Sequence, residues 1–128
     1  MIYNLPDHER AVIYTLGRLT GVKGPGTVFV FPGLQTMRRV DMRSAVADLP
    51  NATVTFHITE PEKALTQVAD YRDAMKQLSE STLARELSGR SKDALVFERK
   101  GIEDAALKSL NAVAAAWGIH VDKVELKR

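Results

Sequence analysis

The residues that could do acid–base or metal chemistry are few and widely spaced. Histidine occurs only as His8, His57 and His120, and none has a second histidine or a carboxylate at the i, i+4 spacing of a helical zinc motif. His57 lies on the polar face of a predicted strand, where a solvated histidine is the simpler interpretation. The alternative is a small hydrolase or ligand-binding enzyme in which His57 works with Glu60 or Asp48.

Other catalytic signatures are weak or missing. The chain has no cysteine, which excludes disulfides, thiolate metal sites and cysteine nucleophiles within it. No Gly-x-Ser-x-Gly elbow surrounds Ser79, Ser81, Ser88 or Ser91. The glycine-rich stretch 21–26 lacks Gly-Lys-Ser/Thr and does not open a helix, so a structural turn explains it. We therefore expect no enzyme activity, cofactor or metal.

Basic residues form the next candidate group. Arg38, Arg39 and Arg43 can lie near Arg18 and Lys23 on neighbouring strands and contact anionic lipid head groups, each charge contributing about 1 kcal/mol. A solvated sheet edge guarded by charge is an equally good interpretation. A basic nucleic-acid-binding module is a third alternative, but 18 Lys and Arg against 16 Asp and Glu leave a net charge of only +2. Because such a footprint needs clustered positive charge, we expect no nucleic-acid partner.

An apolar turn is the remaining candidate. Phe29, Phe31 and Leu34 flank the turn formers Pro32 and Gly33. Apolar residues at a turn are more often core, and the alternative is that they dip into a membrane interface or a partner. We keep the three apolar residues, together with the three arginines, as the candidate membrane-proximal or partner contact.

Length and composition describe the scaffold that must position these residues. With 128 residues, 45% of them hydrophobic and 27% charged, the chain is typical of one soluble globular domain. No apolar run approaches the roughly 20 residues of a membrane-spanning helix. The N-terminus has neither a basic nor an apolar signal region, so we expect no secretory signal.

The first half of the chain has the two-residue period of strands. We predict strands over residues 10–16, 27–31, 34–43 and 52–59, with turn formers at 21–26. The first of these is apolar on both faces, which favours burial. The last alternates between an apolar and a wet face. The segment 44–51 is ambiguous, since Pro50 argues against a central strand there.

The second half has helical spacing. Thr59 and Glu62 have the spacing of a capping box, which predicts a short helix through Val68. Asp70 can cap a second helix over 71–88. A third helix is predicted over 91–116, with Gly101 marking a bend.

That third helix carries a continuous apolar stripe, from Ile102 and Ala106 through Leu110 and Val113 to Trp117. The last strand, 119–126, slips its alternation by one residue, as a β-bulge at Asp122-Lys123 would produce.

The order of elements predicts the fold class. Strands over 9–59, helices over 60–117 and a closing strand over 119–126 favour an α+β fold. We expect a small, largely antiparallel sheet with two to three helices packed on it, forming a single domain over 1–128.

Several motifs, in order along nearly the whole chain, resemble the stomatin/slipin branch of the SPFH (band 7, prohibitin homology) domain. The resemblance opens with Glu9-Arg10-Ala11-Val12-Ile13-Tyr14-x-Leu16-Gly17-Arg18, Phe31-Pro32-Gly33-Leu34 and Val40-Asp41-x-Arg43. It resumes at Glu60-Pro61-Glu62-Lys63-Ala64 and closes at Trp117-Gly118-Ile119-x-Val121-x-x-Val124-Glu125-Leu126. The ordered set is specific, although each piece alone is modest.

The chain departs from the family pattern in two ways. The stretch after Arg43 is contracted to residues 44–59, so we expect a smaller sheet or a strand supplied by another chain. Set against the family pattern, we expect these 128 residues to be the core domain without the family's N-terminal membrane hairpin and C-terminal coiled-coil tail, as a core fragment or a naturally short member.

The resemblance implies a function without catalytic residues. Such proteins assemble into homo-oligomers on the cytoplasmic face of a membrane, organise lipid microdomains and regulate membrane proteases or channels. The resemblance therefore implies a membrane-associated scaffold for the full-length protein. For self-association we expect the start of the apolar stripe, Ile102 and Ala106, to contact another copy. This chain by itself is expected to be soluble.

Overall fold

Strands occupy the first half of the chain and helices most of the second, as the α+β expectation requires. The computed structural model describes residues 1–127. The strands are β1 (Ile2–Leu5), β2 (Glu9–Thr15), β3 (Arg18–Lys23), β4 (Gly26–Phe29), β5 (Gln35–Asp41), β6 (Ala45–Asp48), β7 (Ala52–Ile58) and β8 (Ile119–Leu126). The helices are α1 (Pro61–Thr66), α2 (Tyr71–Leu87), α3 (Lys92–Phe97) and α4 (Arg99–Ala114), followed by a 3₁₀ turn over Ala115–Trp117.

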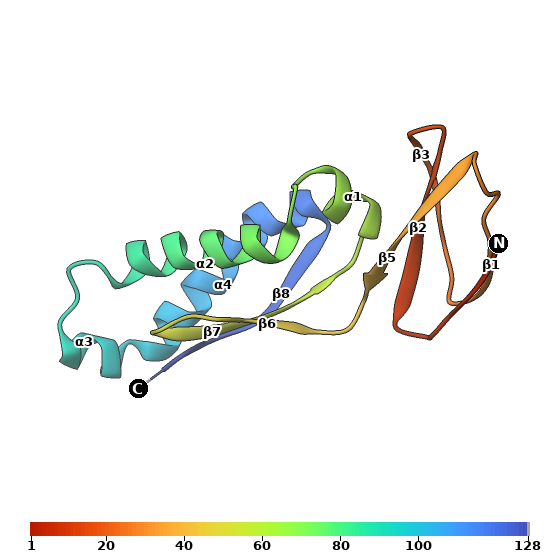
Figure 1. The fold of residues 1–128 in the computed structure, drawn as a ribbon. Coiled ribbons are helices and arrows are strands. Elements are labelled where there is room, and N and C mark those ends of the chain that lie inside the picture. The colour runs from red at the N-terminus through yellow and green to blue at the C-terminus, as the bar shows by residue number, and fades with distance from the viewer. Residues whose placement is uncertain (128) are drawn as a thin grey trace.

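The N-terminal part is a small β-structure at one end of the molecule (Figure 1). β2 is the middle strand of an antiparallel sheet ordered β3-β2-β5, and β1 pairs with β4 in a separate two-stranded sheet. One small apolar cluster joins the two sheets. It consists of Leu5, Ala11, Ile13, Val28 and Val30.

β2 is buried on both faces, as its sequence predicts. Ala11 and Ile13 belong to the small cluster, whereas Val12 belongs to the large core of the molecule. Because successive side chains of a strand point to opposite faces, this one strand connects the two cores.

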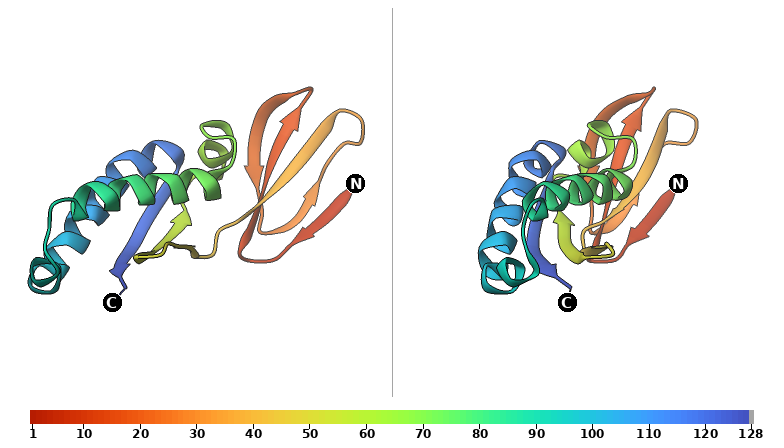
Figure 2. Two further views of the ribbon diagram at one scale, coloured as in Figure 1. Left: turned by 60° about the vertical axis from the view of Figure 1, so that its left-hand side comes forward. Right: turned by 90° about the vertical axis from the view of Figure 1, so that its left-hand side faces the viewer.

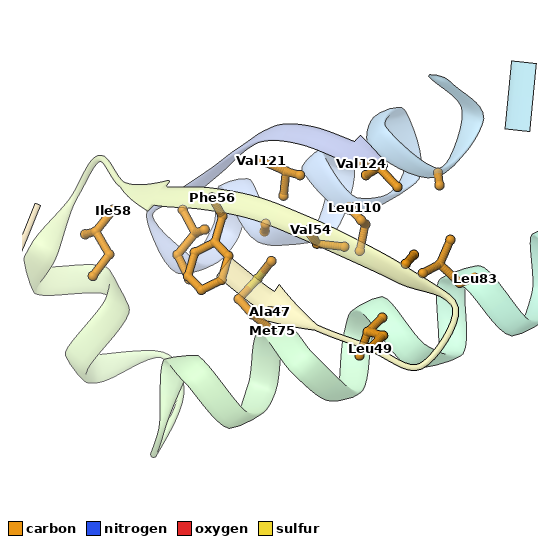
Figure 3. Close-up of a cluster of buried hydrophobic side chains, with 14 of the residues drawn as sticks. Ala47, Leu49, Val54, Phe56, Ile58, Met75, Leu83, Leu110, Val121 and Val124 are labelled. Carbon is orange, nitrogen blue, oxygen red and sulfur yellow. The ribbon is translucent and has the colours of Figure 1, made fainter. Parts of the chain in front are cut away.

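The second sheet, ordered β6-β7-β8, holds the large core. Val54, Phe56 and Ile58 of β7 are buried on one face, and α2 and α4 cover that face (Figures 2 and 3). Met75 of α2 and Leu110 of α4 point into the same cluster (Figure 3). The alternation predicted for 52–59 is therefore confirmed.

β8 contains the predicted bulge. Thr55 of β7 pairs with Lys123 and Phe56 with Val121, so Asp122 has no partner in the ladder. The extra residue lets both Val121 and Val124 face the core. The Asn111 side chain of α4 satisfies both backbone groups of Val121, next to the bulge. It donates to the Val121 carbonyl at 3.0 Å and accepts from the Val121 N–H at 2.8 Å.

The predicted α+β class is confirmed, but the strands of the described residues form three small antiparallel sheets and not one. Three of these strands were not predicted: β1 and β3, and β6, which lies in the ambiguous segment 44–51. β3 is exposed over nearly its whole length and contains Gly21, so no alternation marks it. It is held by pairing with β2, through a turn at Leu16-Gly17.

Two helix boundaries also differ from expectation. Thr59 does not cap α1. Its N–H and hydroxyl both donate to the Gly118 carbonyl, and Glu60 takes the N-cap position without a side-chain bond. The helix predicted over 91–116 breaks at Glu98, not at Gly101, and Ser91 caps the first piece. The Asp70 cap of α2 is confirmed.

No helix in the described part of the chain combines the length and the apolar character needed to cross a bilayer.

Candidate functional site

The predicted apolar turn lies on the surface. Phe29, Phe31 and Leu34 are each about half exposed, at 49%, 55% and 54%. The interpretation of these residues as core is therefore wrong. The two phenyl rings meet edge to face, with centroids 4.8 Å apart.

Further exposed apolar residues extend this surface. Ile2 pairs with Phe29 in the β1–β4 ladder, and the Met1 carbonyl accepts from the N–H of Val30. On the other side, the N–H of Leu16 donates to the Leu34 carbonyl at 2.9 Å. We call this exposed set the apolar edge. It consists of Met1, Ile2, Leu16, Phe29, Phe31 and Leu34.

A hydrogen-bonded turn presents the centre of the apolar edge. The N–H groups of Leu34 and Gln35 both donate to the Phe31 carbonyl, and Gly33 supplies the positive φ of +83° that the turn requires. The Gln35 side chain accepts from the Phe31 N–H at 3.1 Å and donates to the Thr15 hydroxyl at 3.1 Å. Gln35 is thus the main side chain that positions the turn, and its type and spacing gave no signal of this role.

The three candidate arginines do not form one cluster. Arg38 lies opposite Val12 and Arg39 opposite Ala11, so their side chains leave opposite faces of the sheet. Arg39 lies 3.5 Å from a Glu9 carboxylate oxygen and 5.7 Å from the centre of the Tyr3 ring. The charge is therefore spread over two faces, which does not favour a nucleic-acid footprint.

Arg43 is held in an ion pair beyond the end of β5. Its guanidinium lies 2.8 Å from a carboxylate oxygen of Asp41, and its backbone N–H also donates to that carboxylate at 2.9 Å. The side-chain bond from Arg43, followed by the backbone bond, lowers the pKa of Asp41 from 3.8 to about 2. The guanidinium of Arg43 is therefore already paired with Asp41, which leaves it only in part available to an external anion.

His57 has a partner, but not one of the two expected. Its Nδ1 lies 2.8 Å from a carboxylate oxygen of Asp122, the unpaired residue of the bulge. Glu60 pairs instead with Lys63. Asp48 pairs with a lysine at the other end of the sheet, Lys127.

The surroundings of His57 offer little for hydrolysis. His57 borders a shallow hollow of about 270 Å³ that Tyr71 and Arg72 also line. In the described part of the chain, no hydroxyl is hydrogen-bonded to the imidazole in the way that a nucleophile would be. Within residues 1–127, no three histidine or carboxylate side chains are placed to bind a metal ion.

Ile102 and Ala106, the expected self-association residues, lie inside the fold. Their exposed fractions are 2% and 0%, and both belong to the large core between α4 and the β6-β7-β8 sheet. A second copy could reach them only if that core opened. The structure thus corrects the expectation that this pair contacts another copy.

Comparison with known proteins gives a consistent set of relatives. A family model described as "SPFH domain / Band 7 family" matches residues 3–128. A stomatin homologue of Pyrococcus horikoshii is 35% identical over 135 aligned positions, which cover 94% of this chain and 51% of the homologue. Stomatin-like protein 1 of Homo sapiens is 29% identical over 95% of this chain and 34% of its own length. Mechanosensory protein 2 of Caenorhabditis elegans is 31% identical, and the match covers 94% of this chain and 28% of that protein.

The lengths of these matches carry information of their own. The chain spans about half of the archaeal homologue and less of the animal proteins. The 135 aligned positions exceed the 128 residues of the whole chain, so the homologue has residues in the matched region that this chain lacks. The resemblance carried by the ordered motifs is confirmed, and the chain belongs to the SPFH domain / Band 7 family.

Proposed function

We propose that this domain is the core of a non-enzymatic, membrane-associated scaffold that self-associates and contacts the membrane surface through its apolar edge. Proteins of the family are membrane-associated, generally oligomeric and generally not enzymes. In the full-length context, the domain would act at the cytoplasmic face and organise or regulate membrane proteins such as proteases or channels.

The exposed apolar edge is the observation that supports this proposal best. Half-exposed aromatic side chains at a turn are costly to leave in water and gain free energy at a lipid interface. The edge belongs to the β1–β5 end of the molecule, away from α2, α3 and α4, so contact with a flat surface would leave these three helices free (Figure 1).

The test is co-sedimentation of the protein with vesicles that contain anionic phospholipid. Phe31→Glu places a charge in the middle of the apolar edge and should weaken binding about tenfold or more. The matched control is Phe97→Glu, because Phe97 is an even more exposed phenylalanine on α3, at the other end of the molecule.

The two variants carry the same chemical change, so a general loss of hydrophobicity would affect both alike. Equal vesicle binding by Phe31→Glu and the unmodified protein would overturn the proposed role of the edge. So would an equal loss in both variants.

A further inference from the structure

An apolar groove lies at the other end of the molecule, beside the C-terminal end of β8. Its volume is about 690 Å³, and α3, the end of α2 and the end of β8 form its walls. Its apolar lining consists of Leu87, Leu95, Val96 and Leu126. Such a volume lies within the roughly 300–1,000 Å³ of small-molecule sites, which combine apolar walls with a few polar groups.

All the charged side chains that line this groove are cationic. They are Lys92, Arg99 and Lys127. Arg99 donates to the Leu126 carbonyl and lies 3.7 Å from Glu103, and Lys127 pairs with Asp48. Lys92 forms no ion pair with any residue in the described part of the chain. The groove therefore combines an apolar lining with one lysine that has no ion-pair partner among the described residues.

We propose that this groove binds a long-chain carboxylate, that is, a single fatty-acid molecule. The acyl chain would lie against Leu95, Val96 and Leu126, and the carboxylate would accept hydrogen bonds from Lys92 and Arg99. Each methylene buried against these side chains favours binding, and the head group requires a cation.

The size of the groove favours a single acyl chain over an amphipathic protein helix. α3, the helix that forms its outer wall, has six residues, which is about 9 Å of helix. A docked helix is a rod about 10–12 Å across that needs anchors at i, i+3, i+4 and i+7, whereas an acyl chain is thinner and can bend to follow a short wall. No residue of α3 is fully buried, and Leu95 packs against the large core, so the groove is open to solvent along this wall.

The experiment is displacement of a dansyl-labelled fatty acid by oleate, kept below the concentration at which oleate forms micelles. We expect one site per chain, with a Kd on the order of 10 µM. Oleyl alcohol, which has the same chain without the charge, should bind more weakly. Equal binding of the alcohol and the carboxylate would contradict the proposed contact between the carboxylate and the cationic side chains.

Substitutions locate the site. Lys92→Glu should weaken oleate binding roughly three- to tenfold, whereas Lys108→Glu, an equal change of charge on the exposed face of α4, should not. Val96→Asp should weaken it at least about tenfold, and Val113→Asp is its control, a partly exposed valine of α4. Val96 is 74% exposed, so its substitution leaves the core intact.

The site is independent of the proposed membrane contact, and the two can fail separately. Phe31→Glu should retain oleate binding, while Val96→Asp should retain vesicle binding. Oleate binding that disappears in Phe31→Glu would place the fatty acid at the apolar edge and overturn the proposal. So would a failure of the unmodified protein to bind, or equal binding by all the variants.

Discussion

Gly118 is the residue at which the chain can least accept a side chain. Its φ is +68°, and a Cβ placed there would lie 2.4 Å from the Glu60 carbonyl oxygen. The Gly118 carbonyl also accepts from the N–H groups of Thr59 and Glu60, so this residue fastens the end of β7 to the start of β8. Both its conformation and its close approach to α1 require glycine.

Gly118→Ala should therefore lower the free energy of unfolding by at least about 2 kcal/mol, from left-handed strain and the clash together. Gly101 provides the control. It lies within α4 with nothing near its missing side chain, so Gly101→Ala should raise the free energy of unfolding by about 1 kcal/mol. Urea denaturation measures both values, and changes of the same sign would contradict this account.

Asp41 and Arg43 give the fold a dependence on acid pH. The folded protein holds the pKa of Asp41 at about 2, below its ordinary value of 3.8. A carboxyl whose pKa is lowered on folding stabilises the protein above the unfolded pKa, and this contribution is lost as the pH falls through the folded pKa. The sensitive window is therefore about pH 4 down to pH 2.

Arg43→Gln should bring the pKa of Asp41 in the folded protein back towards its ordinary value, because the side-chain bond from Arg43 is the largest cause of the lowered pKa. The pH range over which Asp41 affects stability should therefore become narrower. The unmodified protein should exceed the variant in stability by a constant amount above pH 5. The difference should shrink as the pH falls from 4 towards 2. Denaturation at a series of pH values measures it, and a difference that stays constant down to pH 2 would show that the pair does not act in this way.

At the scale of elements, β6 leaves one edge of its sheet open. The N–H of Leu49 donates to the Ala52 carbonyl, which makes this a hydrogen-bonded pair of the β6–β7 hairpin. Antiparallel pairs alternate, so Ala47 and Ala45 also bond to β7, while the backbone groups of Val46 and Asp48 point outward. Val46 is 61% exposed, and an apolar open edge is a natural surface for pairing with another chain.

We expect self-association to use this edge. Val46→Pro removes an outward N–H without breaking the ladder to β7, and should shift a sedimentation concentration series towards the monomer. Val46→Thr keeps the N–H and the branched shape, so it should associate like the unmodified protein. If the proline variant associates as strongly as the unmodified protein, the β6 edge is not the contact. If the unmodified protein stays a strict monomer at high concentration, this domain does not self-associate.

The elements that the sequence predicts are those whose pattern reflects burial. β2, β7 and β8 are set by apolar residues at strand spacing, and α2 by its Asp70 cap. β1, β3 and β6 have no such clear pattern, and each is stabilised by pairing with a neighbouring strand. Local helix propensity also fails to predict the break between α3 and α4 at Glu98. Gly101 is the weaker helix former nearby, yet α4 continues through it.

At the scale of the whole molecule, exposure is the property that sequence predicts least well. Phe31 and Val12 are both apolar residues in strand-rich segments, yet one is half exposed and the other fully buried. Only the stacking of sheets and helices distinguishes them. The same holds for Arg38 and Arg39, neighbours in sequence that the sheet sends to opposite faces, and for the groove, whose walls come from segments far apart in the chain.

The two proposed surfaces lie at opposite ends of an elongated molecule. The apolar edge belongs to the β1–β5 end, and the groove to the end that carries α3 and the C-terminus (Figures 1 and 2). A protein bound to a membrane through the first would still have the second open to solution. The two contacts can therefore be made at the same time.

The bulge in β8 makes Asp122 a residue that the strand pairing does not need. It stands outside the ladder, so exchanging its side chain leaves the pairing as it is. Deleting it would leave Val121, Lys123 and Val124 in plain alternation opposite Phe56, Thr55 and Val54, so the ladder would run on without a bulge and Val124 would still face the core. Along a lineage, this position can therefore be lost as well as changed, and its loss would remove the carboxylate that lies against His57.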